Sequence, residues 1–93
     1  MATNSERRTV VYTGRVQGVG FRYRTSAIAR RFAVAGYVRN QPEGSVELVV
    51  EGEARELDAF LREVRDALEN NIRDEKFDAQ TASGEFSGFE IRH

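Results

Sequence analysis

The segment Gly14–Gly20, GRVQGVG, has three glycines in seven residues and is therefore expected to be a loop rather than a helix or strand. The residues before it, Thr9–Thr13, are β-branched or aromatic and predict a strand. The residues after it, Phe21–Val34, repeat apolar side chains at helical spacing and predict an amphipathic helix. The chain is thus expected to begin with a strand, a tight loop and a helix in direct succession.

The rest of the chain continues this alternation. In order, the predicted elements are a strand at Tyr37–Asn40, a type I turn at Gln41–Gly44, a strand at Ser45–Glu51, a helix at Ala54–Glu69, a weaker polar strand at Glu75–Thr81 and a last strand at Phe86–Arg92. Gly36 is expected to cap the first helix and Gly52 to end the third strand. The aromatic residues Tyr12, Phe60, Phe77, Phe86 and Phe89 are expected in the core.

The order β-α-β-β-α-β, with a short extra strand at the C-terminus, predicts an α+β fold of the ferredoxin-like, split βαβ sandwich type. Its antiparallel sheet carries both helices on one face, and its first two strands run parallel with the third between them. The carboxyl ends of those two strands share one sheet edge, so the glycine loop and Asn40 are expected to meet there. Residues 1–8 are expected to be a flexible tail and residues 9–93 one domain.

Composition excludes several kinds of chemistry. The chain of 93 residues has no cysteine, which excludes disulfides, a thiol nucleophile and cysteine-bound metal, and its single histidine is His93. It has no apolar run of about 18 residues and no secretory leader, so a cytoplasmic protein without membrane contact is expected. Residues 1–41 carry eight arginines and one acid, whereas residues 42–93 carry six basic residues and fourteen acids. The basic first part favours an anionic ligand, although charged residues also simply solvate helix faces.

The glycine loop has the properties of a phosphate-binding site. Its glycines allow successive backbone N–H groups to point into one concavity, and the following helix N-terminus adds further donors. Arg22, in the first helical turn, can bind two phosphate oxygens at once. A tight strand-to-helix connection would use the same glycines without any ligand. Asn40 can likewise be an ordinary turn residue, because asparagine favours turns.

Three segments resemble the acylphosphatase family: GRVQGVGFR at 14–22, GYVRNQPEGSVELVVEG at 36–52 and the closing GEFSGFEIRH. The resemblance covers residues 9–93 and implies hydrolysis of acyl phosphates without a cofactor or metal. It further implies that Arg22 binds the substrate phosphate and that Asn40 orients the attacking water. The implied backbone cradle consists of Arg15, Val16, Gln17, Gly18, Val19, Gly20 and Phe21. Residues 70–82 are more polar than the fourth strand usual in the family, which leaves the register of that strand open.

The residues agree with this chemistry. The leaving carboxylate of an acyl phosphate is a weak base, because its acid has a pKa of about 4, and it needs no strong general acid. Phosphoryl transfer depends mainly on positioning and on charge stabilisation, which Arg22 and the loop can supply. Glu43, Glu47 and Glu51 recur at every fourth residue and are expected to form a solvated row rather than a metal site.

Two other classes of function remain open. The segment VGFRYR partly matches the aromatic motif of RNA-recognition domains, but it lies in a loop that enters a helix. The second alternative is a non-catalytic or regulatory module that binds phosphate or a carbamoyl group. The expected partners are an acyl phosphate and inorganic phosphate, with no nucleic acid and no membrane, and the expected state is a monomer.

Overall fold

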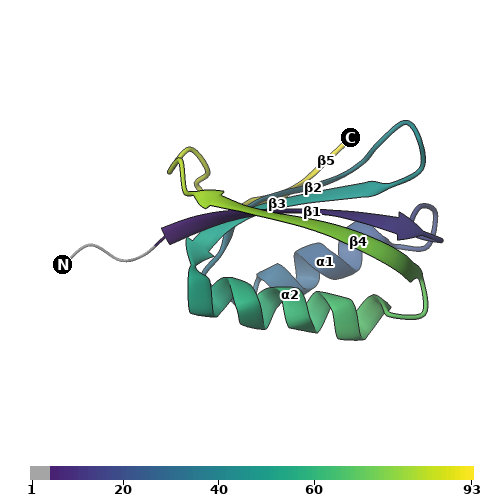
Figure 1. The fold of residues 1–93 in the computed structure, drawn as a ribbon, viewed down its shortest axis with the longest axis horizontal. Coiled ribbons are helices and arrows are strands. Elements are labelled where there is room, and N and C mark those ends of the chain that lie inside the picture. The colour runs from purple at the N-terminus through teal and green to yellow at the C-terminus, as the bar shows by residue number, and fades with distance from the viewer. Residues whose placement is uncertain (1–4) are drawn as a thin grey trace.

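The computed structural model describes residues 5–93 and shows the predicted order of elements (Figure 1). The elements are β1 (Ser5–Gly14), α1 (Phe21–Ala29), β2 (Ala35–Asn40), β3 (Val46–Glu53), α2 (Ala54–Leu68), β4 (Ile72–Thr81) and β5 (Phe89–Arg92). The fold is the expected ferredoxin-like α+β sandwich with an additional C-terminal strand.

The five strands form one sheet in the order β4-β1-β3-β2-β5. β3 lies between β1 and β2 and is antiparallel to both, so β1 and β2 run in the same direction, as predicted. β4 pairs antiparallel with β1, which settles the open register by placing Phe77 opposite Val10. β5 pairs parallel with β2. The complete sheet is therefore mixed, and only its four-stranded part has the expected antiparallel arrangement.

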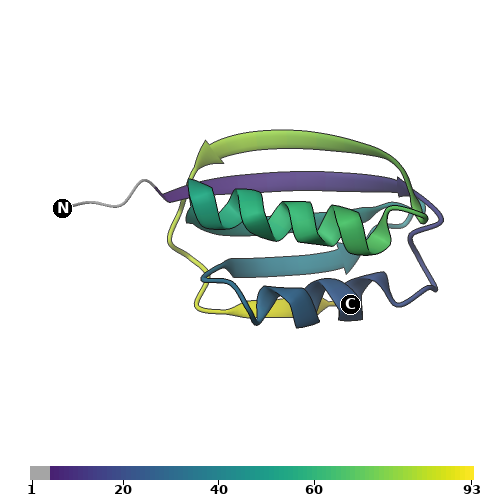
Figure 2. The same cartoon turned by 90° about the horizontal axis from the view of Figure 1, so that it is seen from below.

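Both helices cover the same face of the sheet, and the core lies between the two layers (Figure 1). Seen from the helix side, α2 lies along β1 and β3, while α1 lies along β2 and β5 (Figure 2). The apolar stripe of α2 is fully buried, because its spacing of three and four residues puts one side of the helix on the sheet. The stripe consists of Leu57, Phe60, Val64 and Leu68.

The first helix is shorter than its apolar pattern predicted, and Gly36 is not its cap. α1 ends at Ala29, where hydrogen bonds from the backbone N–H groups of Arg31 and Phe32 to carbonyls three residues earlier turn the chain back toward the sheet. Gly36 lies inside β2 with a φ of +151°. A Cβ at this position would be 1.9 Å from the carbonyl oxygen of Val49, so the glycine is required by the close approach of β3.

The strand ends also differ from the prediction. β1 begins at Ser5, so residues 5–8 of the expected tail pair with β3, while residues 1–4 lie outside the described part of the chain. β3 continues through Gly52 to Glu53 instead of stopping before the glycine. β4 already starts at Ile72 because its whole length pairs with β1.

Two aromatic residues expected in the core lie elsewhere. Phe77 is 58% exposed, because β4 is an edge strand that the helices do not cover, and the guanidinium of Arg8 stacks over its ring at 5.5 Å. Phe86 is only half-buried and packs edge-on against Tyr37, with ring centroids 5.8 Å apart. The other expected core aromatics, Tyr12, Phe60 and Phe89, do pack in or against the core.

Candidate active site

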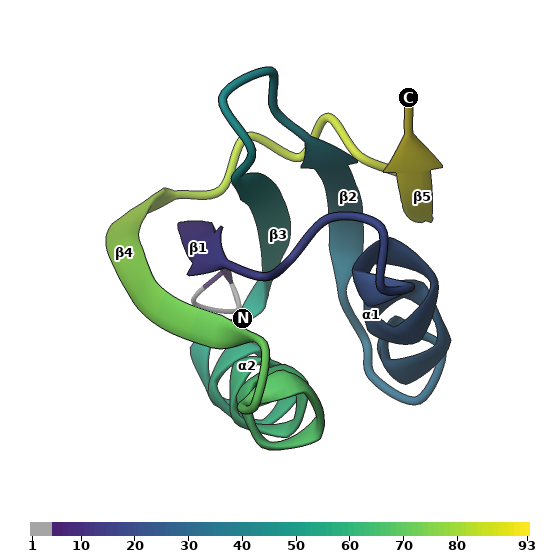
Figure 3. The same ribbon diagram turned by 90° about the vertical axis from the view of Figure 1, so that its right-hand side faces the viewer.

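The glycine loop and Asn40 meet at one edge of the sheet, as the predicted topology required. Figure 3 looks onto this edge, where β1 and β2 end and the loop crosses to α1. A small pocket of about 180 Å³ lies here. Its lining residues are Val16, Gly18, Gly20, Phe21, Arg22, Tyr23 and Asn40. Residues 16–23 and Asn40, which lie 17 to 24 positions apart in sequence, thus share one concave site.

The loop holds its backbone N–H groups free for a ligand. Val16 is 1% exposed and anchors the loop in the core, whereas Gly18 and Gly20 have φ values of +75° and +81°, in the left-handed region that glycine adopts without strain. Within residues 5–93, none of the backbone N–H groups of residues 16–20 donates a hydrogen bond to another protein group. This unpaired run of donors is the arrangement that binds anions.

The N-terminus of α1 adds to this positive site. The first hydrogen bond of the helix runs from the N–H of Arg24 to the carbonyl of Gly20, at 3.0 Å, so the three preceding N–H groups have no intrahelical acceptor. The first turn carries no acidic residue that would compensate the helix dipole. An anion in the pocket would therefore face the helix dipole as well as the loop donors.

Arg22 is half-buried and its guanidinium is held by the end of β5. Its Nη1 donates a hydrogen bond of 3.1 Å to the carbonyl oxygen of Arg92 and lies 3.3 Å from Nδ1 of His93. No carboxylate within residues 5–93 pairs with it. The charge of Arg22 is thus available to a ligand. The contact of His93 was not foreseen, because nothing in the sequence indicates that the chain end passes over α1.

Asn40 is the last residue of β2 and pairs with Val46 across the sheet. It is half-buried, and its side chain makes no hydrogen bond to the protein within residues 5–93. A carboxamide offers both donors and an acceptor. Asn40 can therefore orient a small polar molecule beside an anion bound in the loop.

The side chain of Gln17 has a contact that sequence reasoning missed, since that reasoning used only the backbone of this residue. Its Nε2 donates hydrogen bonds to the carbonyl oxygens of Gln41, at 2.8 Å, and Ser45, at 2.9 Å. The available signal was the residue type, a carboxamide with two donors in a loop otherwise rich in glycine and valine.

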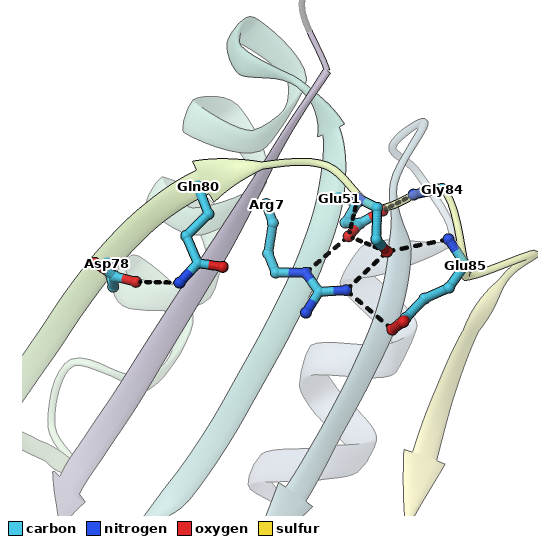
Figure 4. A network of polar contacts seen from close by, with 7 residues as sticks. Arg7, Glu51, Asp78, Gln80, Gly84 and Glu85 are labelled. Atoms are coloured by element: carbon cyan, nitrogen blue, oxygen red, sulfur yellow. Dashed lines mark hydrogen bonds and ion pairs between the residues drawn. The ribbon is translucent and has the colours of Figure 1, made fainter.

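The expected row of solvated glutamates is wrong for Glu51. Glu51 is only 6% exposed, and its carboxylate accepts hydrogen bonds from Arg7 and from the segment between β4 and β5 (Figure 4). Glu47 pairs with Arg39 at 2.6 Å, and Glu43 accepts a hydrogen bond from the hydroxyl of Ser45. In the described part of the chain, no three His, Cys, Asp or Glu residues are grouped so that they could hold a metal ion.

None of the helices in residues 5–93 is long and apolar enough to span a membrane.

Comparison with known proteins finds similarity over almost the whole chain. The sequence model of the Acylphosphatase family matches residues 8–91. An acylphosphatase of Paenarthrobacter aurescens is 39% identical over 92 residues, which is 98% of either chain. One from Rubrobacter xylanophilus is 40% identical over 92 residues, covering 98% of this chain and 84% of the relative.

Comparison of the three-dimensional structures leads to the same family. The crystal structure of acylphosphatase from Bacillus subtilis superimposes with a TM-score of 0.84 at 29% sequence identity, over 95% of this chain and 99% of that one. The family match at residues 8–91 includes the glycine loop and Asn40, which line the pocket.

Proposed function

Because the chain belongs to the acylphosphatase family and is thus a hydrolase of acyl phosphates, we propose how its own residues perform this reaction. Arg22 and the backbone of residues 15–21 bind the phosphate, and Asn40 orients the attacking water. The proposal rests above all on the shared pocket. It brings together an arginine without a carboxylate partner, a run of free N–H donors and an unbonded carboxamide, all judged within residues 5–93.

In the proposed reaction the water oxygen attacks phosphorus while the bond from phosphorus to the acyl oxygen breaks. The carboxylate leaves with the bonding electron pair and needs no proton, because its acid has a pKa of about 4. Charge on the phosphoryl oxygens is stabilised by the guanidinium of Arg22 and by the loop N–H groups. These donors supply the positive charge from the chain itself.

Asn40 positions the water but is not a base, because a carboxamide does not accept a proton at neutral pH. We propose that a phosphate oxygen of the substrate takes the proton of the attacking water, so that the product is inorganic phosphate. Holding water and phosphorus at the reacting distance is then the main contribution of Asn40, and positioning of this kind is worth large factors in rate.

The test is hydrolysis of benzoyl phosphate in the presence of EDTA by the wild type, Arg22→Ala and Asn40→Ala. We expect turnover that resists the chelator, a fall in kcat/KM of about 10³-fold for Arg22→Ala and a fall in kcat of about 10²-fold for Asn40→Ala. Arg24→Ala is the matched control, because Arg24 is an exposed arginine of the same helix that does not line the pocket.

Circular dichroism of each variant reports folding, and size-exclusion chromatography tests the proposed monomer. The charged edge strand β4 supports a monomer, because charges on an edge oppose strand pairing between copies. A wild type that is folded and binds inorganic phosphate without any turnover would contradict the proposed catalysis and favour the phosphate-binding module instead.

A further inference from the structure

The side chain of Gln17 joins the glycine loop to the hairpin that carries Asn40. Its two Nε2 protons go to the carbonyl oxygens of Gln41 and Ser45, at 2.8 and 2.9 Å. Gln17 is half-buried and does not line the pocket, so its carboxamide is committed to these two acceptors rather than to a ligand. A carboxamide nitrogen has only two protons, and both are used.

The two acceptors lie at the base of the turn between β2 and β3. The N–H of Gln41 donates to the carbonyl of Ser45 at 2.9 Å, and the N–H of Gly44 donates to the carbonyl of Gln41 at 3.0 Å. Gln41 directly follows Asn40, and Ser45 directly precedes Val46, which is the partner of Asn40 in the sheet. The carboxamide of Gln17 therefore holds both chain segments next to Asn40.

The sheet places the end of β1 relative to Asn40, because Val46 of β3 pairs with both Tyr12 and Asn40, but the strand pairing ends at Gly14 and does not hold residues 15–20 of the loop. The loop follows β1 and Asn40 ends β2, but β3 lies between these two strands, so they share no backbone hydrogen bonds. The N–H of Arg15 donates to the carbonyl of Asn71, which directly precedes β4 and so lies beside β1 on the side away from β3. Among residues 5–93, the two bonds of Gln17 are the hydrogen bonds that connect residues 15–20 with residues 40–46.

We propose that Gln17 is a positioning residue of the reaction, whose carboxamide holds Asn40 at the correct distance from the phosphate loop. This inference rests on the proposed function above, in which the loop binds phosphate and Asn40 binds water. Loss of the two bonds keeps the loop donors and Arg22 but no longer holds residues 15–20 at a fixed distance from Asn40. The chemical step is then slowed more than phosphate binding is weakened.

Two substitutions separate positioning from general structure. Gln17→Met keeps the length of the side chain but has no donor. Gln17→Glu places a carboxylate against two carbonyl oxygens at neutral pH, whereas its protonated form has one O–H that can donate to either of them. Activity of Gln17→Glu relative to wild type should therefore recover as the pH falls, and that of Gln17→Met should not.

The assay is benzoyl phosphate hydrolysis between pH 4.5 and 8, with each variant divided by wild type at the same pH. At pH 7.5 we expect both variants to lose about 10- to 100-fold in kcat, with the dissociation constant of inorganic phosphate within about threefold of wild type, because its donors remain. The hydrogen bond from the hydroxyl of Ser45 and its own backbone lower the pKa of Glu43, on the same turn, which moves its titration away from this range. Arginines also keep their charge.

Gln80→Glu is the matched control. The Nε2 of Gln80 donates to Asp78 at 3.0 Å on the exposed strand β4 (Figure 4). Gln80 pairs with Arg7 near the start of β1, whereas the loop follows the end of β1 at Gly14. This variant should show wild-type kcat at every pH. A double variant, Gln17→Met with Asn40→Ala, should be little slower than Asn40→Ala alone, because a misplaced Asn40 and a missing one have the same effect.

The outcomes are distinct. A kcat of Gln17→Met within twofold of wild type, a Gln17→Glu deficit that does not change with pH, or phosphate affinity that falls as much as kcat would each overturn the positioning role while the proposed function stands. A folded wild type without turnover would instead overturn the proposed function itself. Recovery of Gln17→Glu toward acid pH, with phosphate binding retained, supports the inference.

Discussion

Glu51 is the buried carboxylate on which the stability of this fold at low pH should depend. Its side chain is 7% exposed. It accepts hydrogen bonds of 2.7 Å from Nε of Arg7, of 2.9 Å from both the N–H and the hydroxyl of Ser83, and of 2.9 Å from the N–H of Gly84 (Figure 4). One carboxylate thereby ties β3 to β1 and to the segment that leads into β5, whose end holds Arg22.

These bonds set the magnitude of the effect. Burial alone raises the pKa of Glu51, but the N–H groups of Ser83 and Gly84, the guanidinium of Arg7 and the hydroxyl of Ser83 outweigh it and lower the pKa from 4.5 to about 2. One pKa unit is worth about 1.4 kcal/mol, so the ionised carboxylate contributes about 3 kcal/mol to folding at neutral pH. Because the folded pKa is the lower one, this contribution is complete well above pH 4.5 and falls by about 2 kcal/mol between pH 7 and pH 3.

The assay is urea unfolding of the wild type and Glu51→Gln at pH 7, 5 and 3, followed by circular dichroism. We expect Glu51→Gln to be less stable by about 3 kcal/mol at pH 7, because the amide cannot replace the charge that these donors face. The difference in the free energy of unfolding between the wild type and Glu51→Gln should be about 2 kcal/mol smaller at pH 3 than at pH 7. Taking the difference between the two proteins removes the titration of the other carboxylates.

Glu90→Gln is the control, because Glu90 is 61% exposed and its partner within residues 5–93 is the exposed Arg92. It should change stability little, because an exposed ion pair contributes little to folding. A gap between wild type and Glu51→Gln that is the same at pH 7 and pH 3 would refute the reasoning, since it would mean that the carboxylate has a similar pKa in the folded and unfolded chains.

Two further predictions concern the core. Gly36→Ala should lower the free energy of unfolding by more than about 3 kcal/mol, because its Cβ would clash with the carbonyl of Val49. If this variant unfolds at the same urea concentration as the wild type, β3 does not approach residue 36 this closely. Thr25→Val should raise the free energy of unfolding by about 1 kcal/mol, because the buried hydroxyl of Thr25 has no hydrogen-bond partner within residues 5–93. A lower melting temperature for this variant would show that the hydroxyl is satisfied in solution.

Much of the fold follows from local patterns. The stripe from Leu57 to Leu68 predicts α2 to within one residue, because an amphipathic helix has a strong periodic signal. The boundaries of α1 and β2 were missed, because the apolar residues Phe32 and Val34 continue the helical spacing although the chain has already turned. Their packing against the core, rather than any local preference, decides that they lie outside the helix.

The residues of the candidate site could be predicted from the sequence, but the contacts that support them could not. The glycine loop, Arg22 and Asn40 are visible in the sequence because glycine spacing, a helix start and a strand end are local properties. The contacts of Gln17 with Gln41 and of Arg22 with the end of β5 are not visible, because they join segments that are distant in the sequence. The burial of Glu51 and its ion pair with Arg7 were missed for the same reason.

The sequence by itself determined the order of strands and helices, the glycine loop between β1 and α1 and the family of the chain, because these depend on neighbouring residues and on motif spacing. Only the tertiary structure decided the partners of Gln17 and Glu51, the parallel pairing of β5 and the exposure of Phe77. Side-chain donors and edge strands find their neighbours only after the sheet has assembled, so no local pattern specifies them.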